Sequence, residues 1–247
     1  MTTVSSGTPA PGRLQRAPGA PPTEATEATE SAGVPDDLEP IVTPLDIPGR
    51  QRQLPTGGRL LHQRILRAFV ETGRAPQRDE LGAMAADLGL DPELAMRGLA
   101  EIDLVHVDAD GVVVAYPFSG RDTGVLVRFG DGPQVPAMCA IDALGIPPMT
   151  GRDAVITATD PHSGEPVRVE SVGGQWSWQP EDAVVLVGRN ETGTTSADKT
   201  CPTITFHTTE DSASSHLAGN NGITGRVLSR DQALDVAAKL FGGLLAE

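Results

Sequence analysis

The sequence is poor in cysteine, in aromatic residues and in positive charge. Only two of its 247 residues are cysteine, and two Trp, one Tyr and five Phe supply its aromatic side chains. Two cysteines cannot build a disulfide scaffold. Because so few residues are aromatic, a core must be made mainly of aliphatic side chains. Nineteen Lys and Arg face 33 Asp and Glu, a net charge of −14. Because non-specific binding to a phosphate backbone rests on Lys and Arg, this balance argues against nucleic acid as a partner.

Long apolar runs are also missing. The longest ones, such as 112–116 and 183–187, have the length of a β-strand. They fall far short of the roughly 20 residues that a membrane-spanning helix needs. The N-terminus carries Thr, Ser and Pro where an exported protein would have an apolar stretch. We therefore expect a cytoplasmic protein without a membrane partner.

Residues 1–58 differ in composition from the rest of the chain. Proline recurs there between Thr, Glu, Gly and Ala, and almost no side chain is larger than Leu. Such a composition cannot bury enough apolar surface to offset the entropy that a chain loses on folding. The sequence predicts a disordered tail over 1–58, with a short docking piece around 38–47.

Residues 59–117 change to a helical pattern. Apolar residues at three- and four-residue spacing predict a helix that ends at Gly73, a second that follows Asp79, and a third that opens at Asp91-Pro92. Two strand-like stretches, 104–107 and 112–116, follow as a hairpin. This order is typical of a winged-helix-like module. Its expected recognition helix begins with carboxylates, and residues 79–103 hold seven acids and one base, which favours packing over DNA binding.

Residues 118–247 read as an α+β domain. Strand-like stretches at 125–129, 154–159, 167–171, 183–187 and 203–207 alternate with turns. Helical patterns occupy 138–144, 210–217 and 229–245. We expect a mixed or antiparallel β-sheet domain with flanking helices. The whole chain is thus predicted as a tail (1–58), a winged-helix-like module (59–117) and a catalytic domain (118–247).

The two cysteines and one aspartate are the candidate chemical groups. On a helix over 138–144, Cys139 and Asp142 are spaced i and i+3 and emerge on one face. Cys201 directly precedes the strand-like stretch 203–207, and two converging thiolates would form a soft-ligand site. Each cysteine has a plain alternative as a buried packing residue, and structural zinc lacks its Cys-x-x-Cys pair. His207, on the strand after Cys201, is expected to pack or to form hydrogen bonds.

Several motifs resemble the organomercurial (alkylmercury) lyase family. The stretch 139–144, Cys-Ala-Ile-Asp-Ala-Leu, is similar to that family's Cys-Ala-Leu-Asp-Thr-Leu motif. The stretches 146–152 and 163–167 and the place of Cys201 before a strand are similar too. The resemblance implies catalytic roles for Cys139, Asp142 and Cys201, with mercury bound by the two cysteine thiolates and a proton handled by the aspartate.

The reaction that the resemblance implies is protonolysis of a carbon–mercury bond. No cofactor is implied, mercury being substrate and product, and external small thiols or a mercury-accepting thiol protein would take the metal away. Two alternatives stay open: a soft-metal protein that binds Hg, Cu or Zn, and a homologue of the lyase fold with another substrate. A third is a winged-helix regulator that responds to thiols or metals, although its expected recognition helix is acidic.

Overall fold

The computed structural model of the chain describes residues 1–2, 45–130, 132–190 and 195–246. All the helices and strands described here lie within one compact unit, residues 34–247. Most of the predicted tail, including its docking piece up to residue 44, lies outside the described residues. None of the described helices is long and apolar enough to cross a bilayer.

The part of the predicted tail nearest the module is folded. Helix α2 (Ile47–Gln53) begins after Asp46, whose side chain accepts a hydrogen bond from the Gly49 backbone N–H. Leu45 and Ile47 are buried in the hydrophobic core. The predicted boundary at residue 58 is therefore wrong for residues 45–58. Leu45 and Ile47 pack into the core, and Asp46 caps the helix. These contacts stabilise the short segment despite its Pro-rich composition.

The next elements follow the predicted order of helices and strands. They are α3 (Thr56–Thr72), α4 (Arg78–Ala86), α5 (Pro92–Glu101), β1 (Val105–Val107), β2 (Val112–Ala115) and β3 (Phe118–Ser119). Helix α3 ends at Gly73, whose φ of 76° suits a residue without Cβ. Asp91 caps α5. The strands form one antiparallel sheet in the order β1-β2-β3. Whether these elements make a true winged-helix module stays a prediction.

A five-stranded antiparallel sheet opens the α+β region. Its order is β5-β4-β6-β7-β8. The strands are β4 (Leu126–Arg128), β5 (Gln134–Pro136), β6 (Ala154–Thr159), β7 (Pro166–Val172) and β8 (Gln175–Gln179). Alternate residues of β6 and β7 are buried, as expected when one face of a sheet covers a core. The predicted α+β class is confirmed, and both sheets of this region are antiparallel.

A second sheet of three strands, β10-β9-β11, carries the C-terminal elements. These are β9 (Val184–Asn190), α7 (Ser196–Lys199), the 3₁₀ turn η2 (Cys201–Thr203), β10 (Ile204–His207), α8 (Glu210–Gly219), β11 (Ile223–Leu228) and α9 (Arg230–Phe241). The central strand β9 is buried at four successive positions. Strands β3, β5, β8 and β11 are additional to those expected from the sequence.

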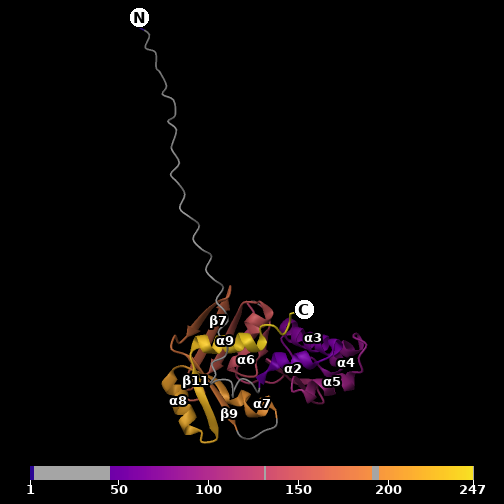
Figure 1. Cartoon of the computed structure of the whole chain (residues 1–247). Coiled ribbons are helices and arrows are strands. Elements are labelled where there is room, and N and C mark those ends of the chain that lie inside the picture. The colour runs from indigo at the N-terminus through magenta and orange to yellow at the C-terminus, as the bar shows by residue number, and fades with distance from the viewer. Residues whose placement is uncertain (3–44, 131, 191–194, 247) are drawn as a thin grey trace, which may run out of the picture. The chain divides into compact units, whose positions relative to one another are not determined.

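Helix α6 (Ala140–Thr150) lies at the centre of this region. It packs against α9 and contacts β4, β6 and β10, and Figure 1 shows α9 lying beside it. Nine of its 11 residues are buried, the pattern of a helix covered all round. It continues through Pro147 and Pro148 to Thr150, beyond the predicted end at 144, and Gly151 caps it. Because α6 is enclosed, groups on its first turn lie in the core.

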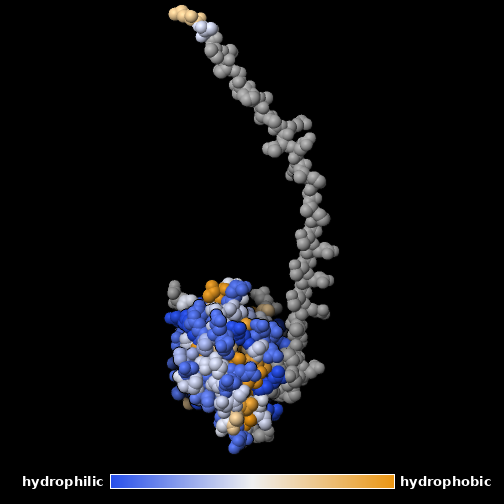
Figure 2. Space-filling view, turned by 90° about the vertical axis from the view of Figure 1, so that its left-hand side faces the viewer, coloured by the Kyte–Doolittle hydropathy of each residue, from blue (hydrophilic) through white to orange (hydrophobic). Residues whose placement is uncertain are grey.

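The surface is mainly polar. The face in Figure 2 is largely hydrophilic, with apolar residues in small groups. Among the described residues, the large apolar side chains that stand exposed are Met1, Leu60, Leu94 and Val172. The aliphatic side chains that dominate the composition are instead gathered in one core cluster.

Candidate active site

Cys139 and Asp142 meet at the start of α6. Cys139 is the N-cap residue of this helix, in extended backbone conformation, and Asp142 lies in the first turn. The Cys139 thiol donates a hydrogen bond to Asp142 Oδ2 at 2.5 Å. The predicted i, i+3 contact is present, with Cys139 one position before the helix rather than inside it.

Cys201 reaches the same point from another part of the chain. It opens the turn η2 directly before β10, as the sequence predicts. Strand β10 pairs with β9 and also contacts α6. The Cys201 thiol lies 3.9 Å from Asp142 Oδ2. One ligand atom from each of Cys139, Asp142 and Cys201 lies within 4.8 Å of the others, so all three predicted residues converge.

The carboxyl group of this cluster is buried together with the two thiols. Asp142 is only 4% exposed. Burial raises the pKa of Asp142 to about 7, because a buried carboxylate loses its hydration, and the opposing hydrogen bonds from Cys139 and Cys201 do not offset this effect. At neutral pH both protonation states of Asp142 are therefore populated.

The two thiols are protonated in the metal-free site. Burial is the main cause that raises the pKa of Cys139 well above its usual value. For Cys201, the hydrogen bond with Cys139 favours the thiolate, but burial and the charge of Asp142 outweigh it, and the pKa is raised as well. A sulfur that binds a cation here must give up its proton, and Asp142 is the adjacent acceptor.

This donor set suits a soft metal ion. Two sulfurs and one carboxylate oxygen converge, and thiolates select soft cations such as Hg²⁺ or Cu⁺. The set falls short of the four ligands of a structural zinc site. A cation held by the two sulfurs would lie against a carboxyl group able to give or take a proton, which is an arrangement for metal binding coupled to proton transfer.

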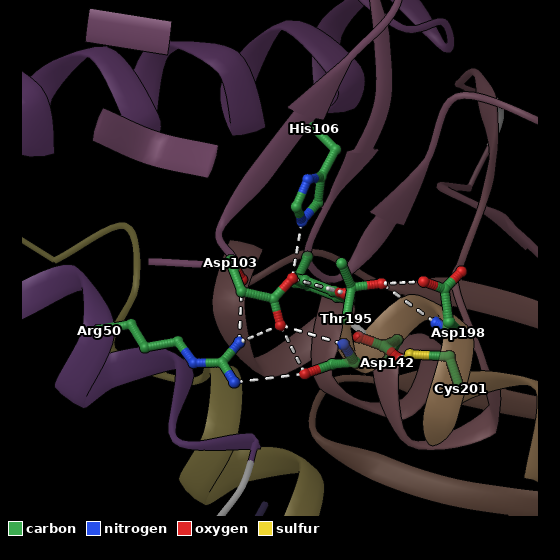
Figure 3. A network of polar contacts seen from close by, with 9 residues as sticks. Arg50, Asp103, His106, Asp142, Thr195, Asp198 and Cys201 are labelled. Atoms are coloured by element: carbon green, nitrogen blue, oxygen red, sulfur yellow. Dashed lines mark hydrogen bonds and ion pairs between the residues drawn. The ribbon is translucent and has the colours of Figure 1, made fainter. Parts of the chain in front are cut away.

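A polar network beside the cluster was not found by sequence reasoning. Its centre is Asp103, which bonds Arg50, His106 and Ser196. Figure 3 shows Asp103 between Arg50 and His106, with Asp142 and Cys201 beyond it. Burial works to raise the pKa of Asp103, but the hydrogen bonds and the charge of Arg50 outweigh it and hold this pKa at about 2. In the sequence, Asp103 appeared only as one of the seven acids of residues 79–103, which gave no sign of this network.

His207 belongs to a different network. Its Nδ1 lies 3.0 Å from Asp160 Oδ1, and its Nε2 lies 2.9 Å from the Thr205 hydroxyl. Asp160 also accepts hydrogen bonds from the backbone N–H and hydroxyl of Thr208 and from Ser212. The prediction that His207 forms hydrogen bonds is confirmed. These bonds fix the corner between β10 and α8, shortly after Cys201.

A cavity of about 440 Å³ adjoins both segments that carry the cysteines. On one side it is lined by Met138, the residue before Cys139, and on another by Ala197 and Asp198 of α7, which precede Cys201. Val113 and Val114 of β2 supply further apolar wall. Its volume lies in the range of pockets for small molecules.

Comparisons with known proteins point to one family. The model of the alkylmercury lyase family (MerB) matches residues 118–242, just over half of the chain, and this range contains Cys139, Asp142 and Cys201. Among solved structures, the crystal structure of the mercury-bound form of MerB2 is similar with a TM-score of 0.67. The sequence identity is 20%, over 83% of this chain and 100% of that one, a likeness in fold. No curated protein sequence matches the chain.

Proposed function

Because the chain belongs to the alkylmercury lyase family, whose members are carbon–mercury lyases, we propose that it cleaves organomercurials by protonolysis. Cys139 and Cys201 bind the mercury atom, and Asp142 carries the proton. The observation that carries this proposal is the convergence of two thiols on one buried carboxyl group. That MerB2, a protein of similar fold, has been crystallised in a mercury-bound form is in keeping with it.

The first step loads the metal. A substrate R–Hg⁺ bonds one sulfur and then the other, and each sulfur loses its proton as its S–Hg bond forms. One of these protons leaves to solvent and the other is taken by the Asp142 carboxylate, which already accepts hydrogen bonds from both thiols. Two thiolates on the metal push electron density toward the organic group.

The second step breaks the carbon–mercury bond. Protonated Asp142 gives its proton to the carbon, the C–Hg electron pair becomes the new C–H bond, and R–H leaves. Hg²⁺ remains on the two thiolates and Asp142 is again a carboxylate. A raised pKa near 7 suits this role, because a general acid works best when its pKa lies close to the operating pH. External thiols then exchange with the cysteines, return their protons and remove the metal.

The cavity beside Met138 and α7 supports the same assignment. It lies between the segments that carry the two cysteines, and its walls combine apolar side chains with a polar rim that includes Arg121 and Asp122. We propose that it receives the organic group, together with a small thiol that carries the mercury. Cys139 and Cys201 are only 2% and 4% exposed, which keeps bulk water from the reacting carbon.

The helical region has a supporting role in this proposal. We propose that residues 59–117 form a winged-helix-like module that packs on the catalytic domain of residues 118–247 rather than binding DNA. The stacked rings of Phe69 and Phe118, with centroids 5.0 Å apart, support this, because they join α3 to the strand where the two parts meet. A cytoplasmic location with ample small thiols fits the need for mercury removal.

The test is protonolysis of phenylmercury by the purified protein in excess thiol, with benzene and free Hg²⁺ both measured. The wild type should release benzene, and Cys139→Ser and Cys201→Ser should abolish release. Asp142→Asn should lower the rate by about 10²–10⁴-fold, the usual contribution of a general acid, while keeping one mercury per chain. Asp153→Asn, an exposed aspartate in the turn after α6, is the matched control and should react like the wild type.

One outcome would favour the second candidate function. If the wild type binds one mercury through both cysteines and releases no hydrocarbon, the lyase proposal is wrong. The protein is then a soft-metal carrier or a homologue with a different substrate. In a carrier, Asp142→Asn should leave the affinity for Hg²⁺ unchanged, because the two sulfurs alone supply the binding.

A further inference from the structure

Asp103 joins three distant parts of the chain at one carboxylate. Its Oδ2 accepts hydrogen bonds from Arg50 Nη1 at 2.9 Å, from the Ser196 backbone N–H at 3.1 Å and from the Ser196 hydroxyl at 2.7 Å. Its Oδ1 lies 2.7 Å from His106 Nε2 and 3.5 Å from the Tyr116 hydroxyl. The carboxylate thus ties α2 and the β1–β2 hairpin to α7.

The backbone of Asp103 also indicates that its side chain matters. Asp103 follows the end of α5 with φ of 55°, and among the described residues it alone is a non-glycine with positive φ. Glycine would adopt this conformation without cost, and Asn and Asp are the side chains that tolerate it best. Its carbonyl accepts a second hydrogen bond from Arg50. An aspartate at position 103 therefore both adopts the left-handed backbone conformation and supplies a carboxylate that bonds Arg50 and Ser196.

The anchored segment leads directly to Cys201. Ser196 is the first residue of α7, a single turn whose start is capped by Thr195. Thr200 follows, and its carbonyl accepts a hydrogen bond from the Thr203 hydroxyl across η2. Five residue steps of tightly bonded chain therefore separate the Asp103 contact from Cys201. An anchor at the first residue of such a segment sets the position of the last.

We propose that Asp103 is a positioning residue that holds Cys201 opposite Asp142 by anchoring the first residue of α7. The buried hydroxyl of Tyr116 adds a second tie, because it contacts Asp103 and also interacts with the backbone of Ala197. The site is then built in part by the helical region, which supplies no reacting group. The consequence for turnover rests on the lyase function proposed above, while the position of Cys201 does not.

The hydrogen bonds of the Asp103 carboxylate determine which variants test the proposal. Asp103→Asn keeps the size of the side chain and tolerates the positive φ, but it replaces one carboxylate oxygen with an NH₂ group that only donates hydrogen bonds. It cannot accept all the hydrogen bonds from Arg50, Ser196 and His106 at once. Ser196→Ala removes one hydroxyl from the same contact and leaves the charge of Asp103 in place. Asp87→Asn, in an exposed weak pair with Arg64 in the same region, is the matched control.

The first measurement is the rate at which iodoacetamide alkylates Cys201 in the native full-length Cys139→Ser protein. Asp103→Asn should raise this rate by at least ~10-fold, because a buried thiol becomes accessible when its segment is released. Ser196→Ala should shift it in the same direction, whereas Asp87→Asn should leave it unchanged. If only Asp103→Asn raises the rate, the effect is one of charge and the positioning proposal is wrong. Unchanged rates in both variants overturn it as well.

The second measurement is turnover with both cysteines present. Asp103→Asn should lower kcat by ~10-fold or more with little change in KM. A displaced Cys201 thiol is misaligned for the chemical step, whereas the initial binding of substrate depends less on its position. Ser196→Ala should show the same split to a smaller extent. No turnover in the wild type would refute the lyase function and leave the alkylation result to decide this proposal. Normal kcat in both variants, with the wild type active, would refute the positioning role alone.

Discussion

At the scale of the residue, the decisive feature is Asp142, a carboxyl group buried where its charged form is destabilised. Asp142 sits in the first turn of an enclosed helix and contacts two thiols that are themselves protonated. Burial favours the neutral acid over the carboxylate, so Asp142 can hold a proton that a metal-binding thiol gives up. Burial, and not a charged neighbour, is the main cause of the raised pKa of Asp142. This pKa therefore follows from the enclosed position of α6.

The raised pKa of Asp142 predicts a pH-dependent stability. The folded-state pKa is about 7 and the usual value is 3.8, so the folded protein holds this proton more tightly than the unfolded chain. The stability that the folded protein gains from holding the Asp142 proton is fully present below pH ~3.8. It declines as the pH rises from ~3.8 to ~7 and is lost above ~7. Asp142→Asn has no such titration, so the stability of the variant relative to wild type should rise from pH 4.5 to 7 and then level off.

Urea unfolding at pH 4.5, 6, 7 and 8 measures this difference. The buried His62 and His207 titrate in both proteins, so their effects cancel in the comparison. A difference in unfolding free energy that stays constant across this range would contradict the assigned pKa.

At the scale of the element, the helix that carries Asp142, α6, packs closely on α9. Gly145 lies on the face of α6 that meets α9, and a Cβ there would come 2.2 Å from the ring of Phe241. Glycine is thus required in mid-helix for close approach and not for backbone freedom. Helix α6 also contacts β10, the strand that follows Cys201.

Gly145→Ala should therefore destabilise the protein, by about 1–3 kcal/mol, because the added methyl overpacks the helix contact. Gly82→Ala is the matched control, since Gly82 is also within a helix, α4, and a Cβ there meets nothing within 4 Å. The control should be stabilised by about 0.5–1 kcal/mol through helix propensity. Thermal and urea unfolding of both variants would test this, and equal effects would contradict the packing explanation.

At the scale of the whole molecule, the C-terminal residues bond to helices α2 and α3. The carbonyl of Leu244 accepts hydrogen bonds from Gln51 and Gln63, and Gln63 also bonds the carbonyl of Ala246. The Leu244 side chain is fully buried in the core cluster, which is continuous from α2 to α9. A continuous core implies that the parts unfold together.

Leu244→Ala should cost about 2–5 kcal/mol, the range for a buried leucine that leaves a cavity. Leu94→Ala, at a leucine that is 62% exposed, should stay within about 0.5 kcal/mol. Near-ultraviolet and far-ultraviolet circular dichroism during urea unfolding should give coincident transitions in both variants. Separate transitions in both variants would show that the chain does not unfold as one cooperative unit.

Much of the architecture could be predicted from local pattern. The order of helices and hairpin strands, the stop at Gly73, the cap at Asp91 and the contact between Cys139 and Asp142 all depend on residues within a few positions of one another. Helix periodicity, caps and turns act over that range, so the sequence expresses them directly. Strand β8 was not predicted, although its two tryptophans alternate with polar residues over five positions after a glycine turn, which is a strand pattern.

The rest was decided by tertiary structure. Cys201 meets Asp142 across 59 residues, and Asp103 meets Ser196 across 93. Such contacts depend on which strands pair and which faces pack, and a local pattern carries no information on either. The folding of residues 45–58 is likewise set by the core that receives Leu45 and Ile47. The sequence by itself determined the reactive groups and their local elements, and only packing could place them together, because burial and long-range pairing belong to the whole chain.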